Sequence, residues 1–528
     1  MKFNSIRFAV AAAVALAAAT AANAATFVAP ADGSSNLTDL SGATSTDGVI
    51  LAALIGTDTA SLCDATGGAP DVYTTEAQLT PGVLIANFAV VCKPKAAIAG
   101  LTNTAIQAVR KYSGGSGSAI GNVASGAVVN PDNANDRQWT TTNPANCTSQ
   151  GLKPAAGGLQ AYNLYTSCTP AGGQITKGGI SDEEPALLGA TSTQLGQLAT
   201  SSGIAVDFAP VISTALFNAL QGAQHLTVNG IDDPANMPNL SAAQLAGIFK
   251  GSIASSAFLF SNPATDTGAT TSLPAAGGTT NIFICRRGNS SGTQTGFGIQ
   301  YLHAGCGTAG VGSPGLGFVA ATTGSCTAGG CGWDGTNFLT DRVFAGTGSQ
   351  DVINCMNFHS TAGHYAIGVL TTEFAPNDAA NAAYRHVKVN GVAPSLENMQ
   401  MGTWDFFTED AFNVPNSTAP NFANVTNDQG KMTAAIQGAF KAAPLLQAAL
   451  VTQGTSTGGS AWWGGALAIP TTTTSSPAPQ GVNSVHALVQ ATPVNSMTRS
   501  ATLGGALNNC NPAWMGSRSL VPVDSASF

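Results

Sequence analysis

The sequence contains few charged residues and few aromatic ones. Asp, Glu, Lys and Arg make up 9% of the 528 residues and Phe, Trp and Tyr 7%, whereas an ordinary soluble domain has about 25% charged residues. The scarce charge is mostly acidic, with 27 Asp and Glu against 19 Lys and Arg. This excludes a basic surface of the kind that binds nucleic acid. It does not exclude an internal anion site, because surface charge is screened beyond about 10 Å.

Long apolar runs are also missing, so we expect no membrane insertion. The N-terminus instead has the pattern of a secretory signal peptide: Lys2 and Arg7 precede a short Ala- and Val-rich run that ends in Ala22-Asn-Ala24. No cysteine follows directly, which argues against a lipid anchor. We predict that residues 1–24 are removed and that the mature protein is periplasmic or secreted. Without Lys2 and Arg7, the 19 cations become 17 against 27 acids, a net charge of −10.

Ten cysteines all lie after the predicted signal peptide. Disulfides form and persist outside the cytoplasm, so we expect them here. At Cys326 and Cys331 a metal site is the alternative to a disulfide. It is disfavoured because no second ligand pair lies nearby at zinc spacing. We expect no metal and no cofactor. Pairing cysteines that are neighbours in the sequence gives three hypothetical bridges: Cys63–Cys92, Cys147–Cys168 and Cys326–Cys331.

Four short polar loops each stand before a helix-like apolar pattern. The first unpaired N–H groups of a helix carry a partial positive charge, so several helix N-termini that converge, with Ser and Thr hydroxyls, would enclose an oxyanion. The loops therefore predict an anion cage. In chain order they are Ser41-Gly-Ala-Thr-Ser45, Tyr112-Ser-Gly-Gly-Ser-Gly-Ser118, Ile180-Ser-Asp182 and Arg287-Gly-Asn-Ser-Ser-Gly-Thr293.

The chain alternates helix-like and strand-like patterns. After the first loop, apolar residues recur at helical spacing, at Val49, Ile50, Ala53 and Leu54. Residues 83–91 form a continuous apolar run with β-branched residues, typical of a buried parallel strand. These patterns predict an α/β protein.

The mature length exceeds what one core supports, since single cores seldom grow past about 250 to 300 residues. We therefore expect two lobes with insertions. Four segments rich in Gly, Ser and Thr read as long surface loops that disulfides tether: 124–178, 262–280, 305–348 and 453–484.

The ordered set of loops resembles the phosphate-binding proteins of bacterial phosphate transporters, which have the type II periplasmic binding protein fold. In that family a Gly-Ala-Thr turn, a Tyr-x-Gly-Ser-Gly-type loop, a Ser-Asp pair and an Arg-x-Asp-x-Ser-Gly-Thr loop surround the ligand in this order. The resemblance covers about residues 38–410. Segments between and after the loops also match: Leu240-Ser-Ala-Ala-Gln-Leu-Ala-Gly-Ile-Phe-Lys-Gly251, His364-Tyr-Ala-Ile-Gly-Val369, and Val389-Asn-Gly-Val-Ala-Pro-Ser395 with Gly402.

The resemblance implies a two-lobed type II periplasmic binding protein fold with long disulfide-tethered loop insertions. Residues 203–212 would be the extended crossover between the lobes, and an amphipathic pattern at 432–452 predicts a helix that completes the first lobe. We expect lobe 1 to comprise residues 25–210 and 404–528, and lobe 2 residues 211–403.

The same resemblance implies ten ligand-binding residues. For the arginine, Arg286 is the alternative to Arg287, which the family register favours because its Arg stands four residues before the Ser of Ser-Gly-Thr, here Ser291. The implied set is Thr44, Ser45, Ser116, Gly117, Ser118, Asp182, Arg287, Ser291, Gly292 and Thr293.

Asp182 is the most diagnostic of these residues. A carboxylate in an anion site is costly unless the ligand brings a proton, so it would favour phosphate over sulfate. The alternative is a helix cap before Glu183, Glu184 and Pro185, with the two glutamates facing solvent; both roles are compatible.

Two positions depart from the family. Asn289 stands where the family has Asp, which leaves the arginine less neutralised, and Ser45 replaces a bulky residue. These departures concern which anion is bound more than whether a site exists.

We therefore expect an extracytoplasmic solute-binding protein for phosphate or a related tetrahedral oxyanion, monomeric, with an ABC permease as a possible partner. The alternative is a secreted or surface-associated scaffold that keeps the fold without a transport role. An enzyme is disfavoured, because no nucleophile has triad partners and the six histidines, among them His359 and His364, read as structural.

Overall fold

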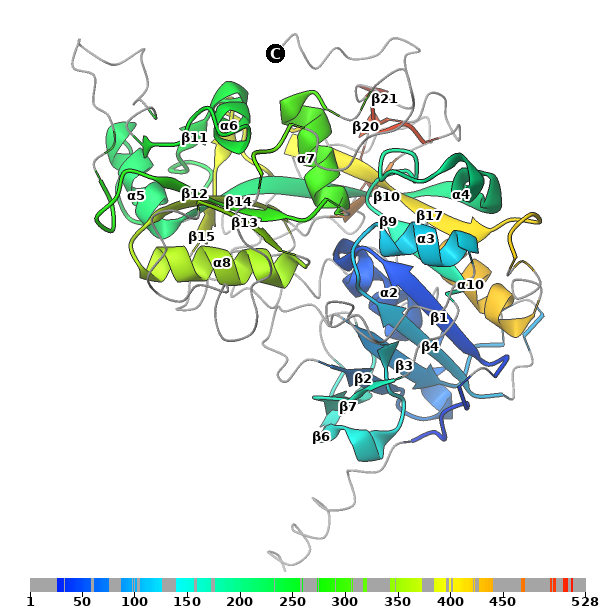
Figure 1. The fold of residues 1–528 in the computed structure, drawn as a ribbon. Coiled ribbons are helices and arrows are strands. Elements are labelled where there is room, and N and C mark those ends of the chain that lie inside the picture. The colour runs from blue at the N-terminus through cyan, green and yellow to red at the C-terminus, as the bar shows by residue number, and fades with distance from the viewer. Residues whose placement is uncertain are drawn as a thin grey trace, which may run out of the picture.

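The computed structural model shows two α/β lobes joined by two long strands (Figure 1). Strands β10 (Leu198–Ser213) and β17 (Phe407–Pro415) run antiparallel to each other across both lobes. The structure describes most of residues 26–439, with its longer gaps at 76–86, 126–138, 260–272, 307–316, 321–341 and 373–383. Beyond residue 439 it describes 467–470, 494–495, 497–499, 507–510 and 514–515.

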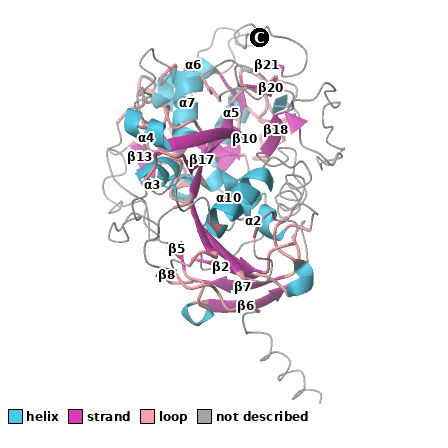
Figure 2. Ribbon diagram, turned by 90° about the vertical axis from the view of Figure 1, so that its right-hand side faces the viewer, coloured by secondary structure: helices cyan, strands magenta, loops and turns pink. Residues whose placement is uncertain are grey.

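The first lobe is built on a mixed sheet. Its strands follow the order β17-β9-β1-β4-β3-β2-β7-β6, and β1 runs parallel to both β4 and β9. Figure 2 shows β2, β7 and β6 at the end of the molecule that lies away from α6 and α7. The elements of this lobe are β1 (Leu37–Gly42), η2 (Thr44–Thr46), α2 (Asp47–Ile55), η3 (Ala65–Gly67), β2 (Asp71–Thr74), β3 (Phe88–Cys92), β4 (Gln107–Tyr112), α3 (Ser118–Ser125), β5 (Trp139–Thr140), η4 (Pro144–Asn146), β6 (Thr148–Lys153), β7 (Tyr162–Thr166), β8 (Pro170–Ala171), β9 (Gly178–Ser181), α4 (Ser192–Gln197) and α10 (Asp428–Ala439).

The second lobe continues the same sheet in the order β13-β12-β14-β10, with β12 parallel to β13 and β14. Helix α8 covers one face of this part of the sheet, and α5, α6 and α7 lie over the other (Figure 1). The elements of this lobe are α5 (Thr214–Ala223), β11 (Asn239–Leu240), α6 (Ala242–Phe249), β12 (Ile282–Arg287), α7 (Gly292–Leu302), β13 (Val343–Gly346), α8 (Ser349–Thr361), β14 (Tyr365–Thr371), β15 (Tyr384–His386) and β16 (Lys388–Val389). Four short strands follow nearer the C-terminus: β18 (Leu467–Pro470), β19 (Val494–Asn495), β20 (Met497–Thr498) and β21 (Trp514–Met515).

Alternation along β12 explains why helices cover both faces of the second lobe. Phe283 and Cys285 pack with Cys355 and other residues of α8, whereas Ile282 and Ile284 belong to the core that contains α6 and α7. Successive strand residues point to opposite faces, so an apolar run of this kind needs cover on both sides.

The predicted two-lobed α/β architecture with disulfide-tethered insertions is confirmed. The Cys63–Cys92 and Cys147–Cys168 bridges are present as predicted. Cys326 and Cys331 lie outside the described residues. Two further bridges, absent from the sequence prediction, join distant segments: Cys285–Cys355 and Cys306–Cys510.

Three local predictions need correction. The described part of the 83–91 run is β3, which pairs antiparallel with β2 and β4, so the prediction of a parallel strand was wrong. The 124–178 segment is not only loop, because it contributes β6 and β7 to the large sheet. The late helix α10 begins at Asp428, before the predicted 432, and residues 440–452 lie outside the described part of the chain.

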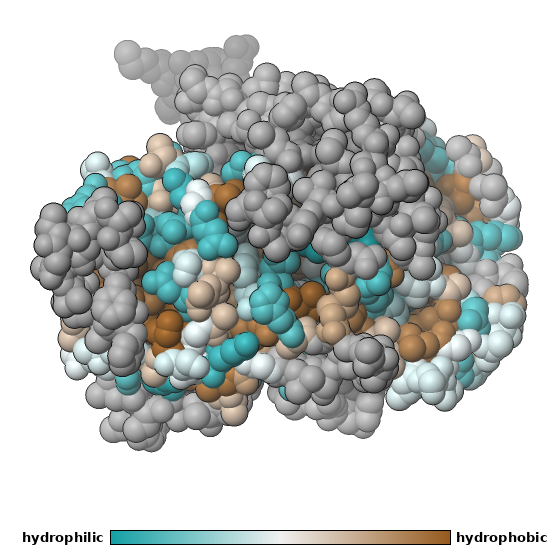
Figure 3. All heavy atoms as spheres, turned by 90° about the horizontal axis from the view of Figure 1, so that it is seen from above, coloured by the Kyte–Doolittle hydropathy of each residue, from teal (hydrophilic) through white to brown (hydrophobic). Residues whose placement is uncertain are grey.

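The described surface mixes hydrophilic and hydrophobic residues, as the view in Figure 3 shows. Within the described ranges, no helix combines the length and the apolar character needed to cross a bilayer. The large apolar side chains that are exposed there come from separate segments, which does not indicate one broad apolar docking patch. They are Val28, Leu152, Leu195, Val228 and Ile231.

Candidate functional site

The predicted ligand loops all follow the carboxyl ends of strands that pair in parallel. β1 leads to Thr44, β4 to Ser116 and β9 to Asp182 in the first lobe, and β12 ends at Arg287 in the second. Ligands of open α/β sheets bind outside the carboxyl ends of such strands. The topology thus brings segments that are distant in sequence to one place.

Gly42 allows the first of these loops to turn. Its φ of +137° lies in the region that favours glycine, and a Cβ there would lie 1.9 Å from the carbonyl oxygen of Ile180. The Ala43 N–H donates to that same oxygen at 2.8 Å. The close approach fixes the Thr44 turn beside the end of β9 and therefore beside Asp182.

A buried ion pair supports the same loop from below. Lys111 Nζ lies 2.9 Å from Asp47 Oδ1 and donates to the Ala43 carbonyl at 3.0 Å. Ser113 donates to Asp47 Oδ2 at 2.6 Å. Because all these groups are buried, the loops that follow β1 and β4 are held together as one unit.

Asp182 stands at the centre of the converging loops. Ser45 Oγ donates to its Oδ1, and Ser116 Oγ lies 3.0 Å from its Oδ2 and 3.2 Å from its backbone nitrogen. The Thr293 backbone also hydrogen-bonds to this carboxylate. All four residues are buried, so the carboxylate is enclosed by donors from three separate segments.

The start of α7 packs directly against Asp182. A Cβ at Gly292 would lie 2.6 Å from Asp182 Oδ2 and 2.5 Å from Ser116 Oγ, so no larger residue fits without a shift. The carboxylate thereby faces the positive end of the α7 dipole. A residue of the first lobe contacts a helix end of the second, and the two lobes are closed on each other in this structure.

Burial raises the pKa of Asp182 above its ordinary value. The hydrogen bonds from Ser45 and Ser116 and the charge of Arg287 act in the opposite direction but do not cancel it. This carboxyl group therefore holds a proton more readily than an exposed aspartate does.

Arg287 belongs to the second lobe, at the end of β12. Its Nη1 donates to Ser349 Oγ at 2.9 Å, and its Nη2 would lie 3.3 Å from a Cβ at Gly115 of the Tyr112 loop. Asn289, which stands where the family has Asp, is exposed. The guanidinium thus lies between the Tyr112 loop and the start of α8.

Arg286 points elsewhere, as expected for neighbours on a strand. Its Nη1 donates to the Arg287 carbonyl oxygen at 2.9 Å, and its guanidinium carbon lies 5.8 Å from the Phe318 ring centroid. Burial lowers the pKa of Arg286. Of the two arginines considered from the sequence, Arg287 is the one beside the other predicted site residues.

Three predicted residues have local roles in the loops. The Ser291 hydroxyl caps α7 by accepting the Gln294 N–H at 3.3 Å, and the Ser118 hydroxyl donates to the Gly115 carbonyl at 2.8 Å. The Gly117 carbonyl accepts from the Ile120 N–H at 3.2 Å as α3 begins. These contacts shape the N-termini of α3 and α7.

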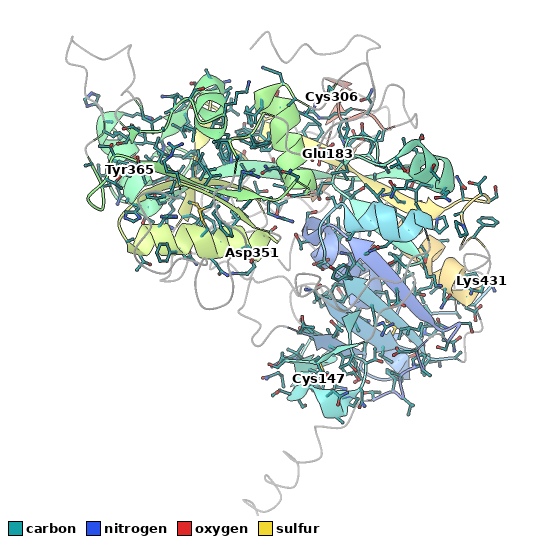
Figure 4. All side chains as sticks on the ribbon, in the orientation of Figure 1. Cys147, Glu183, Cys306, Asp351, Tyr365 and Lys431 are labelled. Atoms are coloured by element: carbon teal, nitrogen blue, oxygen red, sulfur yellow. A yellow bond between two sulfur atoms is a disulfide. The ribbon has the colours of Figure 1, made fainter. Side chains whose placement is uncertain are left out.

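Sequence reasoning missed one site element, the start of α8. Ser349 is 5% exposed, and its hydroxyl lies 2.9 Å from Arg287 Nη1 and 3.2 Å from Thr44 Oγ1. Figure 4 shows the neighbouring Asp351 at the end of α8 that faces the first lobe. The signal was Gly346-Thr-Gly-Ser349 between a strand and a helix, but its first three residues belong to the 305–348 segment, which we predicted to be surface loop. That prediction was wrong at its end, where the segment contributes β13 to the large sheet.

Two predictions about the residues after Asp182 were wrong. No helix starts there: turns follow at 185–189, and α4 begins only at Ser192, so Asp182 is not a helix cap. Glu183 does not face solvent. It is fully buried behind the site, beneath Cys306 in Figure 4, and burial raises its pKa well above the ordinary value.

A segment near the C-terminus contacts this buried acidic region. The Arg499 N–H donates to Glu409 Oε1 at 2.6 Å and its Nε to the Phe407 carbonyl at 3.1 Å. Asn509 donates to Glu184 through both its backbone and its side chain, the latter at 2.9 Å. We call residues 497–499 and 507–510 the C-terminal clamp; Cys510 ties it to Cys306 just after α7.

His359 and His364 are buried in the second lobe. Their Nδ1 atoms lie 3.2 Å apart, and both rings stack on Phe283. His359 also lies beside Cys285 and Cys355, with the possible ligand atoms within 4.8 Å of one another, but these two sulfurs are joined in a disulfide. Burial lowers the pKa of His359 to about 3, and burial also lowers the pKa of His364.

No protein-family model and no curated protein matches this chain. Its fold is similar to that of a phosphate ABC transporter substrate-binding protein from Clostridium perfringens with bound phosphate, at 13% identity and a TM-score of 0.34, covering 76% of this chain and 93% of that one. An ABC-type phosphate transport receptor from Vibrio cholerae is similar at 13% identity and a TM-score of 0.25, covering 50% and 79%. A phosphate-binding protein from Stenotrophomonas maltophilia is similar at 16% identity and a TM-score of 0.27, covering 49% and 69%.

These neighbours are of the same class as the family that the polar loops resemble.

Proposed function

We propose that this protein is an extracytoplasmic solute-binding protein for phosphate or a related tetrahedral oxyanion, bound between the two lobes. The observation that carries the proposal is the convergence of Asp182 and Arg287 from opposite lobes, at the carboxyl ends of their strands. The residues proposed to bind the ligand are Thr44, Ser45, Ser116, Gly117, Ser118, Asp182, Arg287, Ser291, Gly292 and Thr293.

The chemistry of this set fits a tetrahedral oxyanion. A guanidinium offers a planar fork of donors to two oxyanion oxygens. Helix N-termini add backbone N–H groups without a full charge. Asp182 accepts a proton from the ligand, which favours hydrogen phosphate over sulfate, since sulfate carries no proton at neutral pH.

Hinge movement of the lobes about β10 and β17 would admit and release the ligand. In the closed form, Thr44, Ser116, Asp182 and Arg287 are each at most 9% exposed. Exclusion of water strengthens every charged hydrogen bond in such a site. An ABC permease that receives the ligand from the closed form is the proposed partner.

A scaffold or scavenging role without a permease is the second candidate. The observation that favours it is the C-terminal clamp, which ties the end of α7 to Glu184 and Glu409 and would resist wide opening of the lobes. Cell fractionation separates the two roles. A periplasmic pool that restores phosphate uptake supports transport, and recovery mainly from the culture medium or outer surface supports the scaffold.

Isothermal titration of ligand-stripped, folded protein with phosphate, arsenate, sulfate and molybdate tests the binding function. We expect heat from phosphate and arsenate and much weaker binding of sulfate. Absence of heat from all four would refute the proposal.

A further inference from the structure

Ser349 lies where the two lobes meet and links a residue from each. Arg287 Nη1 donates to its hydroxyl oxygen at 2.9 Å. The same hydroxyl also hydrogen-bonds to Thr44 Oγ1, which lies 3.2 Å away, and either hydroxyl can be the donor. The resulting chain runs from the end of β12, through the start of α8, to the end of β1.

The Ser349 hydroxyl is available because other groups cap α8. The Gly348 N–H donates to Asp351 Oδ2 at 2.9 Å, and the cap position itself makes no side-chain hydrogen bond. Asp351 therefore completes the helix start. Ser349 is left to point at the guanidinium, together with the positive end of a 13-residue helix.

The neutrality of this partner affects the charge of the site. A carboxylate in hydrogen-bond contact with Arg287 would form an ion pair and compete with an incoming anion. Ser349 provides the same geometry without the charge, and Asn289 is exposed and uncharged. Among the described residues, Asp182 after β9 interacts electrostatically with Arg287, and the carboxylate of Asp351, two residues after Ser349, is engaged in the α8 cap.

We propose that Ser349 determines both the closure and the anion specificity of the site. Its hydroxyl joins Thr44 to Arg287 when the lobes close, and because it is neutral it adds no carboxylate that would compete with a doubly charged oxyanion at the guanidinium. This inference rests on the oxyanion-binding function proposed above.

Three substitutions and one control test the role. Ser349→Ala removes the link without adding charge, Ser349→Asp adds a carboxylate beside Arg287, and Ser349→Thr restores a hydroxyl. Gln350→Ala is the matched control, because Gln350 is the next residue on α8 and is exposed. Phosphate titration at pH 5.5 and pH 8, small-angle X-ray scattering of the ligand-free proteins and thermal melts are measured for each.

We expect Ser349→Ala to weaken phosphate binding about tenfold, as for a lost hydrogen bond to a charged group. Its ligand-free form should have a larger radius of gyration than the wild type. Ser349→Asp should weaken binding about a hundredfold at pH 8, where phosphate is mainly doubly charged, and less at pH 5.5, because like charges repel. Ser349→Thr and Gln350→Ala should behave like the wild type.

Wild-type affinity and closure in both Ser349→Ala and Ser349→Asp would overturn the proposal. So would equal losses at both pH values in Ser349→Asp. If Ser349→Ala melts below the assay temperature, the contrast between Ser349→Thr and Ser349→Asp decides instead. If the wild type binds none of the oxyanions, the proposed function fails, and the scattering comparison of ligand-free wild type and Ser349→Ala still decides the closure role.

Discussion

Asp182 and Glu183 are neighbours in the chain but lie in two different electrostatic environments. Asp182 faces the candidate site, where hydroxyls from two loops and the start of α7 enclose its carboxylate; we call this the front side. Glu183 faces the opposite way, into a region that it shares with Glu184 and Glu409 and that we call the back side. Arg499 is the cation that acts on all three glutamates.

The difference shows how a fold separates an exchangeable charge from a permanent one. Neutral donors on the front side can be shared with the ligand proposed above. On the back side, the positive charge of Arg499 acts on the buried acids through space, and its side chain is held there by hydrogen bonds to the Phe407 and Asp405 carbonyls. The C-terminal clamp supplies that cation, although the resemblance to phosphate-binding proteins does not extend to this part of the chain.

The largest expected effect comes from Arg499→Met on the back side. It leaves the buried glutamates without their cation, and breaking a buried pair of this kind costs about 3 to 5 kcal/mol of unfolding free energy. Burial raises the pKa of Glu183 and Glu184. The protonated forms of these two glutamates therefore contribute favourably to the free energy of unfolding. This contribution is fully present below the unfolded pKa and is lost as the pH rises through the folded pKa.

Urea unfolding at pH 5 and pH 8 measures this effect. The variant should lose more stability at pH 8 than at pH 5, because protonation relieves the unpaired charge. Equal stability of variant and wild type at pH 8 would contradict the assigned role of Arg499.

Arg287→Ala addresses the front side. Truncating one partner of a buried charged contact should weaken phosphate binding by about 2 to 5 kcal/mol. Titration calorimetry measures the loss, and Arg286→Ala is the matched control because that side chain points to Phe318. A larger loss of phosphate affinity in Arg286→Ala than in Arg287→Ala would mean that Arg286, and not Arg287, contacts the ligand.

Removal of the Cys306–Cys510 bridge by replacing both cysteines with serine tests whether the clamp acts on stability alone. A disulfide of this kind contributes about 2 to 4 kcal/mol through the unfolded state. We expect a lower melting temperature and an unchanged phosphate affinity. A large change in affinity would mean that the back side also controls the site.

Asp182→Asn gives the smallest effect and the most specific one. The amide keeps the shape of the carboxyl group and removes its charge, so phosphate affinity should fall by about 1 to 3 kcal/mol, and sulfate should gain relative to phosphate. Competition titrations with the two anions measure the ratio. An unchanged ratio would remove Asp182 as the discriminating residue.

The wild type has a matching pH dependence. Burial raises the pKa of Asp182, so its carboxyl group gains a proton more readily as the pH falls. Protonation turns it from an acceptor into a donor, and the preference for phosphate over sulfate should therefore narrow at acid pH.

Much of the site was readable from short sequence patterns. The Gly-Ala-Thr turn and the Arg287 loop begin helices as predicted, because helix starts depend on local capping residues and apolar spacing. The Cys63–Cys92 and Cys147–Cys168 bridges were also predictable, since each joins two cysteines that follow each other in the sequence.

Other features left no usable local signal. The antiparallel pairing of β3 depends on the strands beside it. Its own apolar run does not distinguish parallel from antiparallel pairing. The Cys306–Cys510 bridge spans 204 residues, and spacing gives no basis for choosing it. The burial of Glu183 depends on Arg499, which lies more than three hundred residues away.

The sequence by itself determined some of the local units: the helices that follow the Gly-Ala-Thr turn and the Arg287 loop, the apolar run that forms β3, and the residue types that could meet an oxyanion. Local conformation follows from neighbours within a few residues, so it can be read along the chain. Only the tertiary structure decided that Ser349 joins Thr44 to Arg287 and that the C-terminal clamp neutralises the acids behind Asp182. Such contacts depend on the packing of distant strand ends and on burial, which raises the energetic cost of every unpaired charge.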